Sequence, residues 1–326
     1  MGTVSQPEIS AVRVELVAVV MTVEADRPRV LSAGDPLHLP AGPLRSDQAS
    51  LQASVREFVL EQAGHRLGFV EQLYTFADAG RSGPDVGAAS HGMAGQDLGM
   101  AGLGVAGQDR EVSISYLGLT RPGSTPAWTD IYALMPWEDR RGPTEAVARR
   151  LQPLLDALST WAGAEESDAR RARADFLFGL AGHPWRPELA LQRYELLWQA
   201  GLVAESGGGP AVALTGPGMY ADHRRILATG LARLRATLQY RPVVFELLPE
   251  AFTLSRLQEV VEALAGNTVH TQNFRRLVEH QHGLVEPTGG VETQTGGRPA
   301  RLYRFRRSVF TERDLVGTKL PVHRTR

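Results

Sequence analysis

The sequence contains no cysteine, which excludes disulfide bonds and thiolate-ligated metal sites. It also lacks an apolar run of about 18 residues, the length that a membrane-spanning helix needs. A basic start followed by an apolar core and a cleavage site, as in a signal peptide, is absent too. We therefore expect a cytoplasmic protein with no membrane partner.

The sequence has no large excess of either charge, since 35 Lys plus Arg stand against 36 Asp plus Glu. Residues 241–326 nevertheless hold 13 Lys plus Arg and 9 Asp plus Glu, a net charge of +4, while the rest of the chain is acidic. Basic regions attract nucleic-acid phosphates, so DNA is a candidate partner of the C-terminal part. A chain of 326 residues is long for one domain, and we expect two.

The N-terminal half predicts three strands, a segment of strand and turn at residues 31–44, and one helix. Residues 11–23, AVRVELVAVVMTV, are mostly β-branched and apolar, which is typical of a buried strand, and residues 69–78 and 111–119 also predict strands. The helix is expected to begin after Ser50, a suitable N-cap, and to end near Gly64. Its apolar side holds Leu51, Val55, Phe58 and Val59.

A Gly/Ala-rich stretch covers residues 82–110 and contains a formal G-x-G-x-x-G at Gly102, Gly104 and Gly107. A dinucleotide site needs a strand before this motif and a helix after it. Here low-complexity sequence precedes the motif and a strand follows. A loop insertion is therefore favoured over a dinucleotide site.

The rest of the chain is mainly helical. We interpret residues 140–215 as a helical insertion that joins or braces domains, and a further helix covers residues 219–240. Two helices at residues 252–266 and 269–289, followed by a basic Gly-rich hairpin at 290–307, predict a winged helix-turn-helix. In that motif the second helix is the candidate reader of the major groove.

Residues 39–65, LPAGPLRSDQASLQASVREFVLEQAGH, resemble a Nudix box, in which helical carboxylates one turn apart hold Mg²⁺ against a pyrophosphate. With Gly64 on the final glycine, Phe58 replaces one carboxylate, Glu61 matches, and Gln62 replaces another. Shifting the frame by one residue restores Arg56 and Glu57 but loses a carboxylate at Leu60. Both frames predict an inactive hydrolase with no metal site and no catalytic residues.

A second resemblance covers the C-terminal half. The segments MYADHRRILATGLARLRATLQYRPVVFELLPEAFTLSRLQEVVEALAG, NFRRLVE and GGRPARLYRF look like the NrtR family of Nudix-related transcriptional regulators of NAD metabolism. The resemblance implies a homodimer that binds operator DNA and senses ADP-ribose or an NAD-related nucleotide, without a cofactor. The candidate ligand-binding residues are Arg56, Glu61 and Arg81.

The second winged helix carries the residues expected to contact DNA. Phe274, Leu277, Val278 and Gln281 follow helical spacing and should face the core, which leaves polar residues on the other side. Arg can bind guanine and Asn can bind adenine in the major groove. The DNA-binding candidates are Thr271, Gln272, Asn273, Arg275 and Arg276 of this helix, and Arg298 and Arg301 of the wing.

We predict an α/β Nudix-like sandwich with a helical insertion, followed by a winged helix-turn-helix. The sensor is expected at residues 9–240, the DNA-binding domain at 241–310 and a tail at 311–326. The function expected is that of a ligand-responsive repressor of NAD metabolism genes. One alternative is an ADP-ribose or nucleotide pyrophosphatase with an accessory nucleic-acid-binding domain. Another is a ligand-binding module that controls a protein partner through the helical block.

Overall fold

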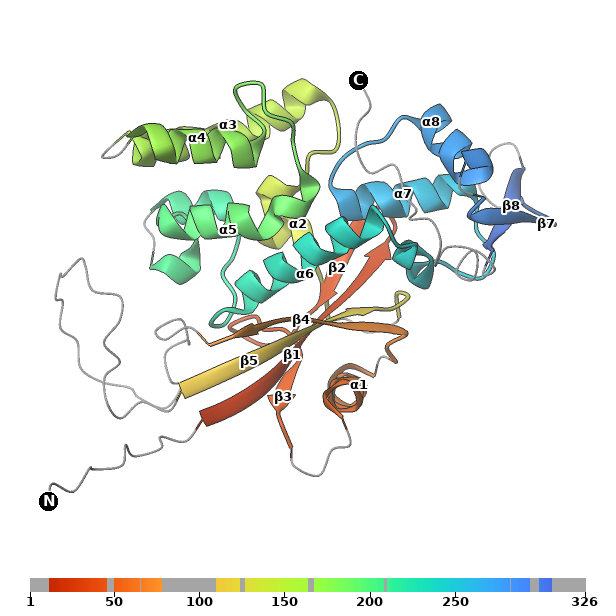
Figure 1. The fold of residues 1–326 in the computed structure, drawn as a ribbon, viewed down its shortest axis with the longest axis horizontal. Helices are drawn as coiled ribbons and strands as arrows, with labels where there is room; N and C mark the ends of the chain where they lie inside the picture. Colours follow the sequence, from red (N-terminus) through yellow and green to blue (C-terminus); the bar gives the residue numbers. More distant parts are fainter. Residues whose placement is uncertain are drawn as a thin grey trace, which may run out of the picture.

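The computed structural model describes residues 12–45, 50–64, 66–77, 110–123, 127–163, 167–207, 210–281, 283–293 and 299–306. A twisted mixed sheet forms one part of the molecule, and helices cover both of its faces (Figure 1). No helix within these ranges is both long and apolar enough to cross a membrane.

Strand β1 (Val12–Glu24) is the centre of the sheet and is buried on both faces. Its alternate residues enter two different apolar clusters, as the two-residue period of a strand requires. Val17, Val19 and Met21 face one cluster, and Leu16 and Ala18 face the other. This double burial explains why the strand has a continuous apolar sequence.

The sheet has the strand order β4-β5-β1-β2-β6, and β3 pairs with β1 off this path. Among the described strand pairs of this sheet, β1–β5 is parallel and the others are antiparallel. Strand β1 pairs with β5 and β3 in its first part and with β2 in its last part. The remaining strands are β2 (Arg27–Leu31), β3 (Ala41–Pro43), β4 (Phe69–Phe76), β5 (Arg110–Leu119) and β6 (Trp128–Asp130).

Helix α1 (Leu51–Ala63) covers one face of the sheet, and α6 (His223–Leu238) covers the other. Gly230 lets α6 approach β1 closely, since a Cβ there would lie 2.8 Å from Cγ1 of Val19. The predicted strands at 11–23, 69–78 and 111–119 and the helix after Ser50 are confirmed.

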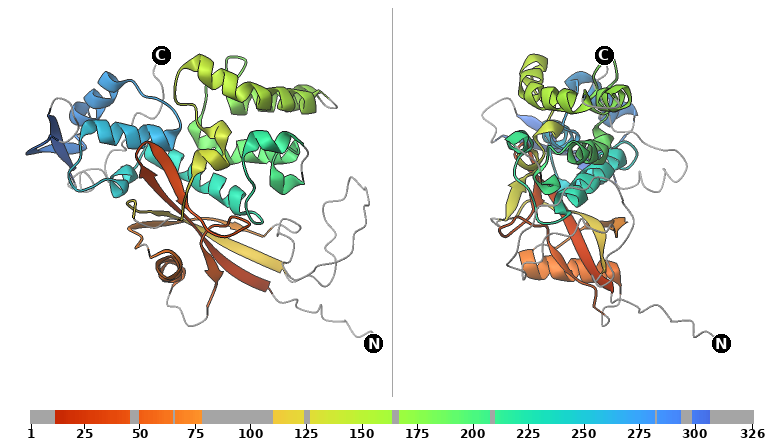
Figure 2. Two further views of the ribbon diagram at one scale, coloured as in Figure 1. Left: turned by 180° about the vertical axis from the view of Figure 1, so that it is seen from behind. Right: turned by 90° about the vertical axis from the view of Figure 1, so that its left-hand side faces the viewer.

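The block at 140–215 is helical, as predicted. It contains α3 (Thr144–Ala162), α4 (Ser167–Phe178) and α5 (Ala190–Gln199), preceded by the short α2 (Ile131–Leu134). Both views in Figure 2 show α3 and α4 at the end of the molecule opposite α1. Helix α5 packs along α6, so the block rests on the helical layer rather than on the sheet.

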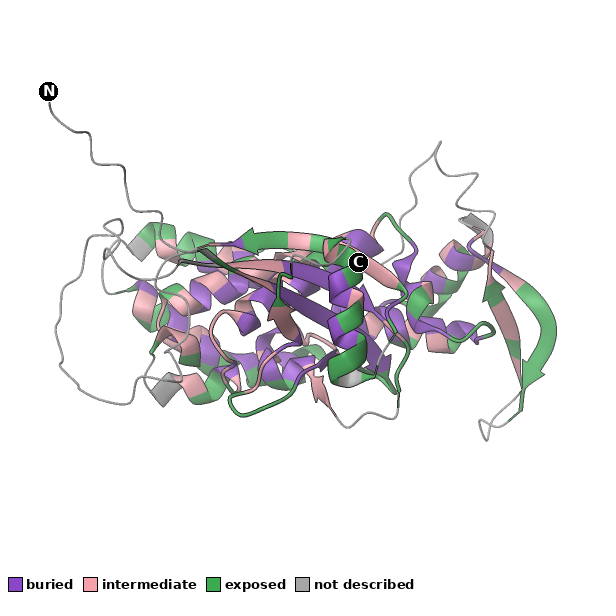
Figure 3. Ribbon diagram, turned by 90° about the horizontal axis from the view of Figure 1, so that it is seen from below, coloured by how far each residue is buried: buried purple, intermediate pink, exposed green. Residues whose placement is uncertain are grey.

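The C-terminal unit contains two helices and a hairpin. Its first helix is α7 (Leu254–Ala265), and α8 (Thr271–Arg276) continues into a π-helical turn at Leu277–Gln281. The hairpin pairs β7 (Val285–Glu292) with β8 (Ala300–Phe305). Figure 3 shows this hairpin projecting from one end of the molecule with much of its surface exposed.

One detail of the predicted winged helix is wrong. The second helix was expected to extend to residue 289, but the described helical residues end at Gln281 and β7 already begins at Val285. Pro287 and Gly289 disfavour a strand, yet β7 accommodates them where its pairing with β8 is irregular, between Pro287 and Val291.

Candidate functional site

Helix α1 sits where the Nudix-like box was expected, and local capping fixes its ends. The hydroxyl of Ser50 accepts a hydrogen bond from the backbone N–H of Ala53 at 3.2 Å. Gly64 ends the helix in the left-handed conformation, with φ of 66°. Val55 and Val59 are fully buried under the sheet. Among the described residues of α1, the exposed ones lie on the opposite side of the helix.

Phe58 and Gln62, which stand at carboxylate positions of the box, do not present oxygen ligands. Phe58 is buried, and its ring packs beside Gly42, where a Cβ would lie 3.5 Å from Cδ1 of Phe58. The Gln62 amide donates a hydrogen bond to the Ala41 carbonyl at 2.7 Å. Each side chain thus joins α1 to the β3 segment instead of facing a cation.

These residues do not fit a magnesium ion. Mg²⁺ needs several hard oxygen ligands in near-octahedral geometry, and Phe58 offers none. Glu57 and Glu61 are exposed on α1. Within the described ranges, no three His, Asp or Glu side chains are grouped so that they could hold a metal ion.

The predicted ligand-binding residues have different surroundings. The guanidinium of Arg56 donates to the carbonyls of Leu67 and Gly68, so it fastens α1 to the segment before β4. Glu61 is exposed five residues further along the helix. Arg81, like the motif at 102–107, lies outside the described residues. The structure therefore brings no pair of the three candidates together among the residues it describes.

Helix α8 divides into a buried and an exposed side, as predicted. Phe274 and Val278 are fully buried, and Leu277 is half-buried, while Gln281 has no described side-chain surroundings. His270 stands at the N-cap and makes no side-chain cap hydrogen bond, in keeping with the missing acidic cap in the sequence. The exposed residues are Thr271, Gln272, Arg275 and Arg276, and Asn273 is half-buried.

Two contacts hold the polar side chains of α8 in place. Arg276 donates to the side-chain oxygen of Asn273 at 3.0 Å, which places the two candidate base-reading groups side by side. Arg275 donates to the hydroxyl of Ser255 on α7 at 3.3 Å. Arg276, which is exposed, thus lies next to the half-buried Asn273 on the polar side of the helix.

The hairpin provides a second basic element. Arg301 is exposed on β8, opposite Val291 of β7. Arg298 lies outside the described residues. Tyr303 of β8 donates to Glu279 beyond α8 at 2.7 Å and pairs through its backbone with Phe252 before α7. The wing is therefore fastened to both helices of the unit.

A family model described as the NrtR DNA-binding winged helix domain matches residues 244–305. The C-terminal unit thus resembles the NrtR-type winged helix. A curated relative, the "ADPR responsive transcriptional repressor NtrR" of Acinetobacter baylyi, is 37% identical over 84 residues, which are 26% of this chain. The match spans 33% of the relative's own length.

Solved structures extend the likeness from this winged helix to the whole fold. Shewanella oneidensis NrtR in complex with a 27mer DNA matches with a TM-score of 0.51 and 18% identity, over 91% of this chain and 95% of that one. A second crystal structure of Shewanella oneidensis NrtR matches with a TM-score of 0.50 and the same identity and coverage. The predicted fold class and the resemblance to NrtR are confirmed.

A buried charged cluster beside the winged helix was not predicted from the sequence. Glu138 receives hydrogen bonds from Arg193 and Arg235, and all three side chains are buried. Burial alone would raise the pKa of Glu138, but the charges and hydrogen bonds of the two arginines outweigh it and hold that pKa below its usual value. Glu138 is therefore ionised in the folded protein.

Proposed function

We propose that this protein is a transcriptional repressor of NAD metabolism genes that binds operator DNA through its winged helix. In this proposal Arg276 and Asn273 of α8 read bases, and Thr271, Gln272, Arg275, Arg298 and Arg301 contact phosphates or neighbouring base edges. The observation that carries the proposal is the NrtR-type winged helix, whose second helix exposes Arg275 and Arg276 over a buried Phe274.

The Nudix-like half is proposed as the sensor of ADP-ribose or a related nucleotide, without catalysis. The replacement of carboxylates by Phe58 and Gln62 supports the loss of hydrolysis. The name of the Acinetobacter baylyi relative, "ADPR responsive", supports ADP-ribose as the effector. Arg56, Glu61 and Arg81 stay the proposed ligand-binding residues, with Arg suited to the pyrophosphate.

The proposed assembly is a homodimer acting in the cytoplasm, where operator DNA is found. Two winged helices related by a two-fold axis read a palindromic site. The sensor at residues 9–240 and the DNA-binding domain at 241–310 are the proposed domains, with the tail at 311–326. The matched residues 244–305 lie inside the second of them.

A mobility-shift assay on the DNA upstream of the protein's own gene tests this function, with a scrambled duplex of equal length as the control. We expect a shift on the upstream DNA at protein concentrations that leave the scrambled duplex free. Equal affinity for both duplexes would contradict a repressor. Binding of ADP-ribose in calorimetry, without release of products, would separate a sensor from a pyrophosphatase.

A further inference from the structure

The C-terminal end of helix α7 is capped by donors from outside the winged helix. The Tyr132 hydroxyl donates to the carbonyl of Ala263, and Nε of Arg235 donates to the carbonyl of Leu264 at 2.8 Å. The last carbonyls of a helix have no partner within the helix, so these two donors satisfy groups that would otherwise need water. The positive guanidinium also suits the negative end of the helix.

The turn after α7 is held by the same segment. The backbone N–H of Arg140 donates to the carbonyl of Gly266 at 2.7 Å. Gly266 has a φ of 68°, and a Cβ there would lie 2.3 Å from the carbonyl oxygen of Glu138. The C-terminal end of α7 thus packs directly against the segment that contains Tyr132 and Glu138.

Buried ion pairs hold these capping groups in place. Arg193 of α5 binds both carboxylate oxygens of Glu138, at 2.7 and 2.8 Å, and Arg235 of α6 binds one of them. Arg193 and Arg235 also donate to the carbonyl of Pro187, each at 3.1 Å. The helical block, through α5, thereby fixes the arginine that caps α7.

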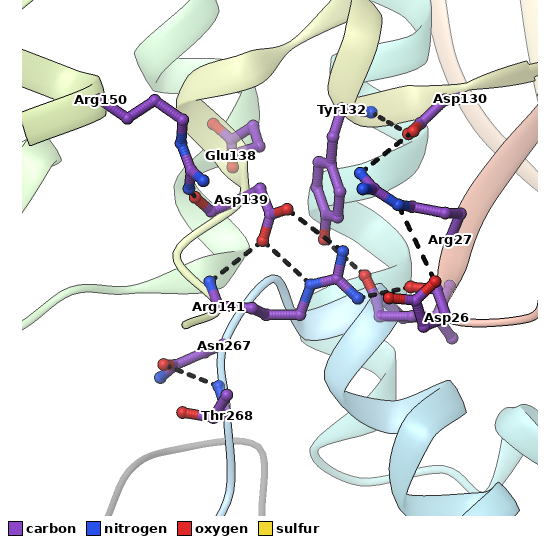
Figure 4. A network of polar contacts seen from close by, with 12 residues as sticks. Asp26, Arg27, Asp130, Tyr132, Glu138, Asp139, Arg141, Arg150, Asn267 and Thr268 are labelled. Atoms are coloured by element: carbon purple, nitrogen blue, oxygen red, sulfur yellow. Dashed lines mark hydrogen bonds and ion pairs between the residues drawn. The ribbon is translucent and has the colours of Figure 1, made fainter. Parts of the chain in front are cut away.

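The first turn of α7 is attached to the sheet. Arg256 donates to the carbonyl of Val23 at the end of β1, at 3.1 Å, and to that of Ala25 in the β1–β2 connection. Arg141 links the same connection to the segment before the block, because it pairs with Asp139 and donates to the carbonyl of Asp26 (Figure 4). Helix α7 is therefore fastened at both ends to parts of the chain outside the winged helix.

We propose that Tyr132, Arg235 and Arg256 are positioning residues for DNA binding, which fix the recognition helix α8 through α7. Helix α8 begins only five residues after Gly266. The intervening turn is itself held, since Glu262 of α7 accepts from the backbone N–H of Val269 at 2.8 Å. The direction of α7 therefore sets that of α8. This inference rests on the proposed function and gives the helical block a role in it.

The test uses Tyr132→Phe and Arg256→Ala in the full chain, since neither leaves a large cavity. Arg27→Ala is the matched control, because Arg27 directly follows the β1–β2 connection, as the first residue of β2, but pairs with Asp26 and Asp130 instead of α7. Affinity is measured for the operator and for a scrambled duplex. Hydrogen exchange of residues 270–276 reports the mobility of α8, and thermal unfolding shows that each variant is folded.

In both test variants we expect the operator preference over scrambled DNA to fall by about tenfold while scrambled affinity stays within about twofold. Exchange at residues 270–276 should become faster, and Arg27→Ala should match the wild type. The operator preference of Arg256→Lys should lie between those of the wild type and Arg256→Ala, because an ammonium group cannot bond two carbonyls with the fixed geometry of a guanidinium.

Three other outcomes would overturn the positioning role. An unchanged operator preference in both variants, with a wild type that discriminates, would leave the repressor function standing and remove the inference. An equal loss on operator and scrambled DNA would identify Arg256 as a phosphate contact instead. A wild type that does not discriminate would refute the proposed function, and the inference with it.

Discussion

At the scale of single residues, Phe58 and Gln62 decide what α1 can do. One packs beside Gly42 and the other donates to the Ala41 carbonyl, so neither offers the charged oxygen that Mg²⁺ requires. We therefore expect ADP-ribose with Mg²⁺ to be hydrolysed no faster with the protein than in buffer. Turnover that requires metal and disappears in Glu61→Ala would contradict this expectation.

Arg276 and Arg301 should differ in the kind of DNA contact they make. Arg276 lies beside Asn273 on the recognition helix, so Arg276→Ala should cost about 1 to 3 kcal/mol on the operator and relax the preference at one base pair. Arg301 lies on the wing, and its loss should weaken binding to all sequences alike and lower the salt slope by about one. DNA-binding titrations of both variants, on operator and scrambled duplexes across a salt series, measure these effects. A full operator preference in Arg276→Ala would disprove the assignment of α8.

His223 should make the stability depend on pH. Burial, with a smaller contribution from His38, lowers the pKa of His223 to about 4 from 6.5. Its Nδ1 accepts the backbone N–H of Leu39 at 2.8 Å, which requires a neutral ring. Between pH 6.5 and about 4 the unfolded chain binds a proton that the folded chain does not. The contribution of the neutral His223 ring to the free energy of unfolding is therefore complete above pH 6.5. It is lost as the pH falls from 6.5 to about 4.

His223→Asn tests this dependence, because the Asn oxygen can replace Nδ1 as the acceptor but does not titrate. The free energy of unfolding should fall between pH 7 and 4.5 by about 1 to 3 kcal/mol more in the wild type than in the variant. Denaturant unfolding at several pH values measures the difference. Parallel pH profiles would show that His223 is not responsible.

Some residue environments follow from sequence and others do not. The burial of Phe274 and Val278 follows from helical spacing. The burial of Arg193 and Arg235 does not, because charged helical residues are normally solvated and their shared partner Glu138 is distant in the sequence. Arg56 similarly bonds carbonyls that only the tertiary fold brings near.

At the scale of elements, strong local signals predicted the longer helices and strands. Ser50 and Gly64 mark the ends of α1 through capping, which depends only on nearby residues. Strand β6 has three residues and was missed, because pairing with β2 creates it rather than any periodicity, whereas β3 lies in the segment at 31–44 for which strand and turn were predicted. The early start of β7 was missed for the same reason, since β8 supplies its partner.

The packing of the C-terminal end of α7 against the Glu138 segment can be tested with a pair of glycine substitutions. Gly64 and Gly266 both end helices with nearly equal φ, 66° and 68°. A Cβ at Gly64 would meet nothing within 4 Å, so Gly64→Ala should cost only the backbone strain of about 1 to 2 kcal/mol. Gly266→Ala should cost about 1 to 3 kcal/mol more, because its Cβ would collide with Glu138. Equal losses of unfolding free energy in the two variants, measured by denaturant unfolding, would show that the end of α7 does not pack against Glu138.

At the scale of the whole molecule, one apolar cluster runs from the sheet through α6 into the winged helix. It contains Val19 of β1, Leu231 of α6 and Val261 of α7. The sequence predicted two domains from a change in pattern and charge near residue 240, and that boundary stays a prediction. The shared core was not predictable, because it depends on which apolar helix faces pack together in three dimensions.

The proposed dimer predicts the symmetry and the half-site spacing of the operator. Two recognition helices should lie about 34 Å apart, so the site should be a palindrome with half-sites one helical turn, or a multiple of it, apart. Footprinting on the upstream DNA, together with the molar mass of the complex in solution, tests this expectation. A single half-site bound by one chain would contradict it.

The most direct measurement is the affinity for the operator with and without saturating ADP-ribose, taken together with the affinity for ADP-ribose with and without the operator. If the Nudix-like half senses the nucleotide and the winged helix binds DNA, ADP-ribose should change operator affinity by about fivefold or more. The operator should change ADP-ribose affinity by the same factor, since linkage is reciprocal. Operator affinity that is unchanged by ADP-ribose, although the nucleotide binds, would contradict a ligand-responsive repressor.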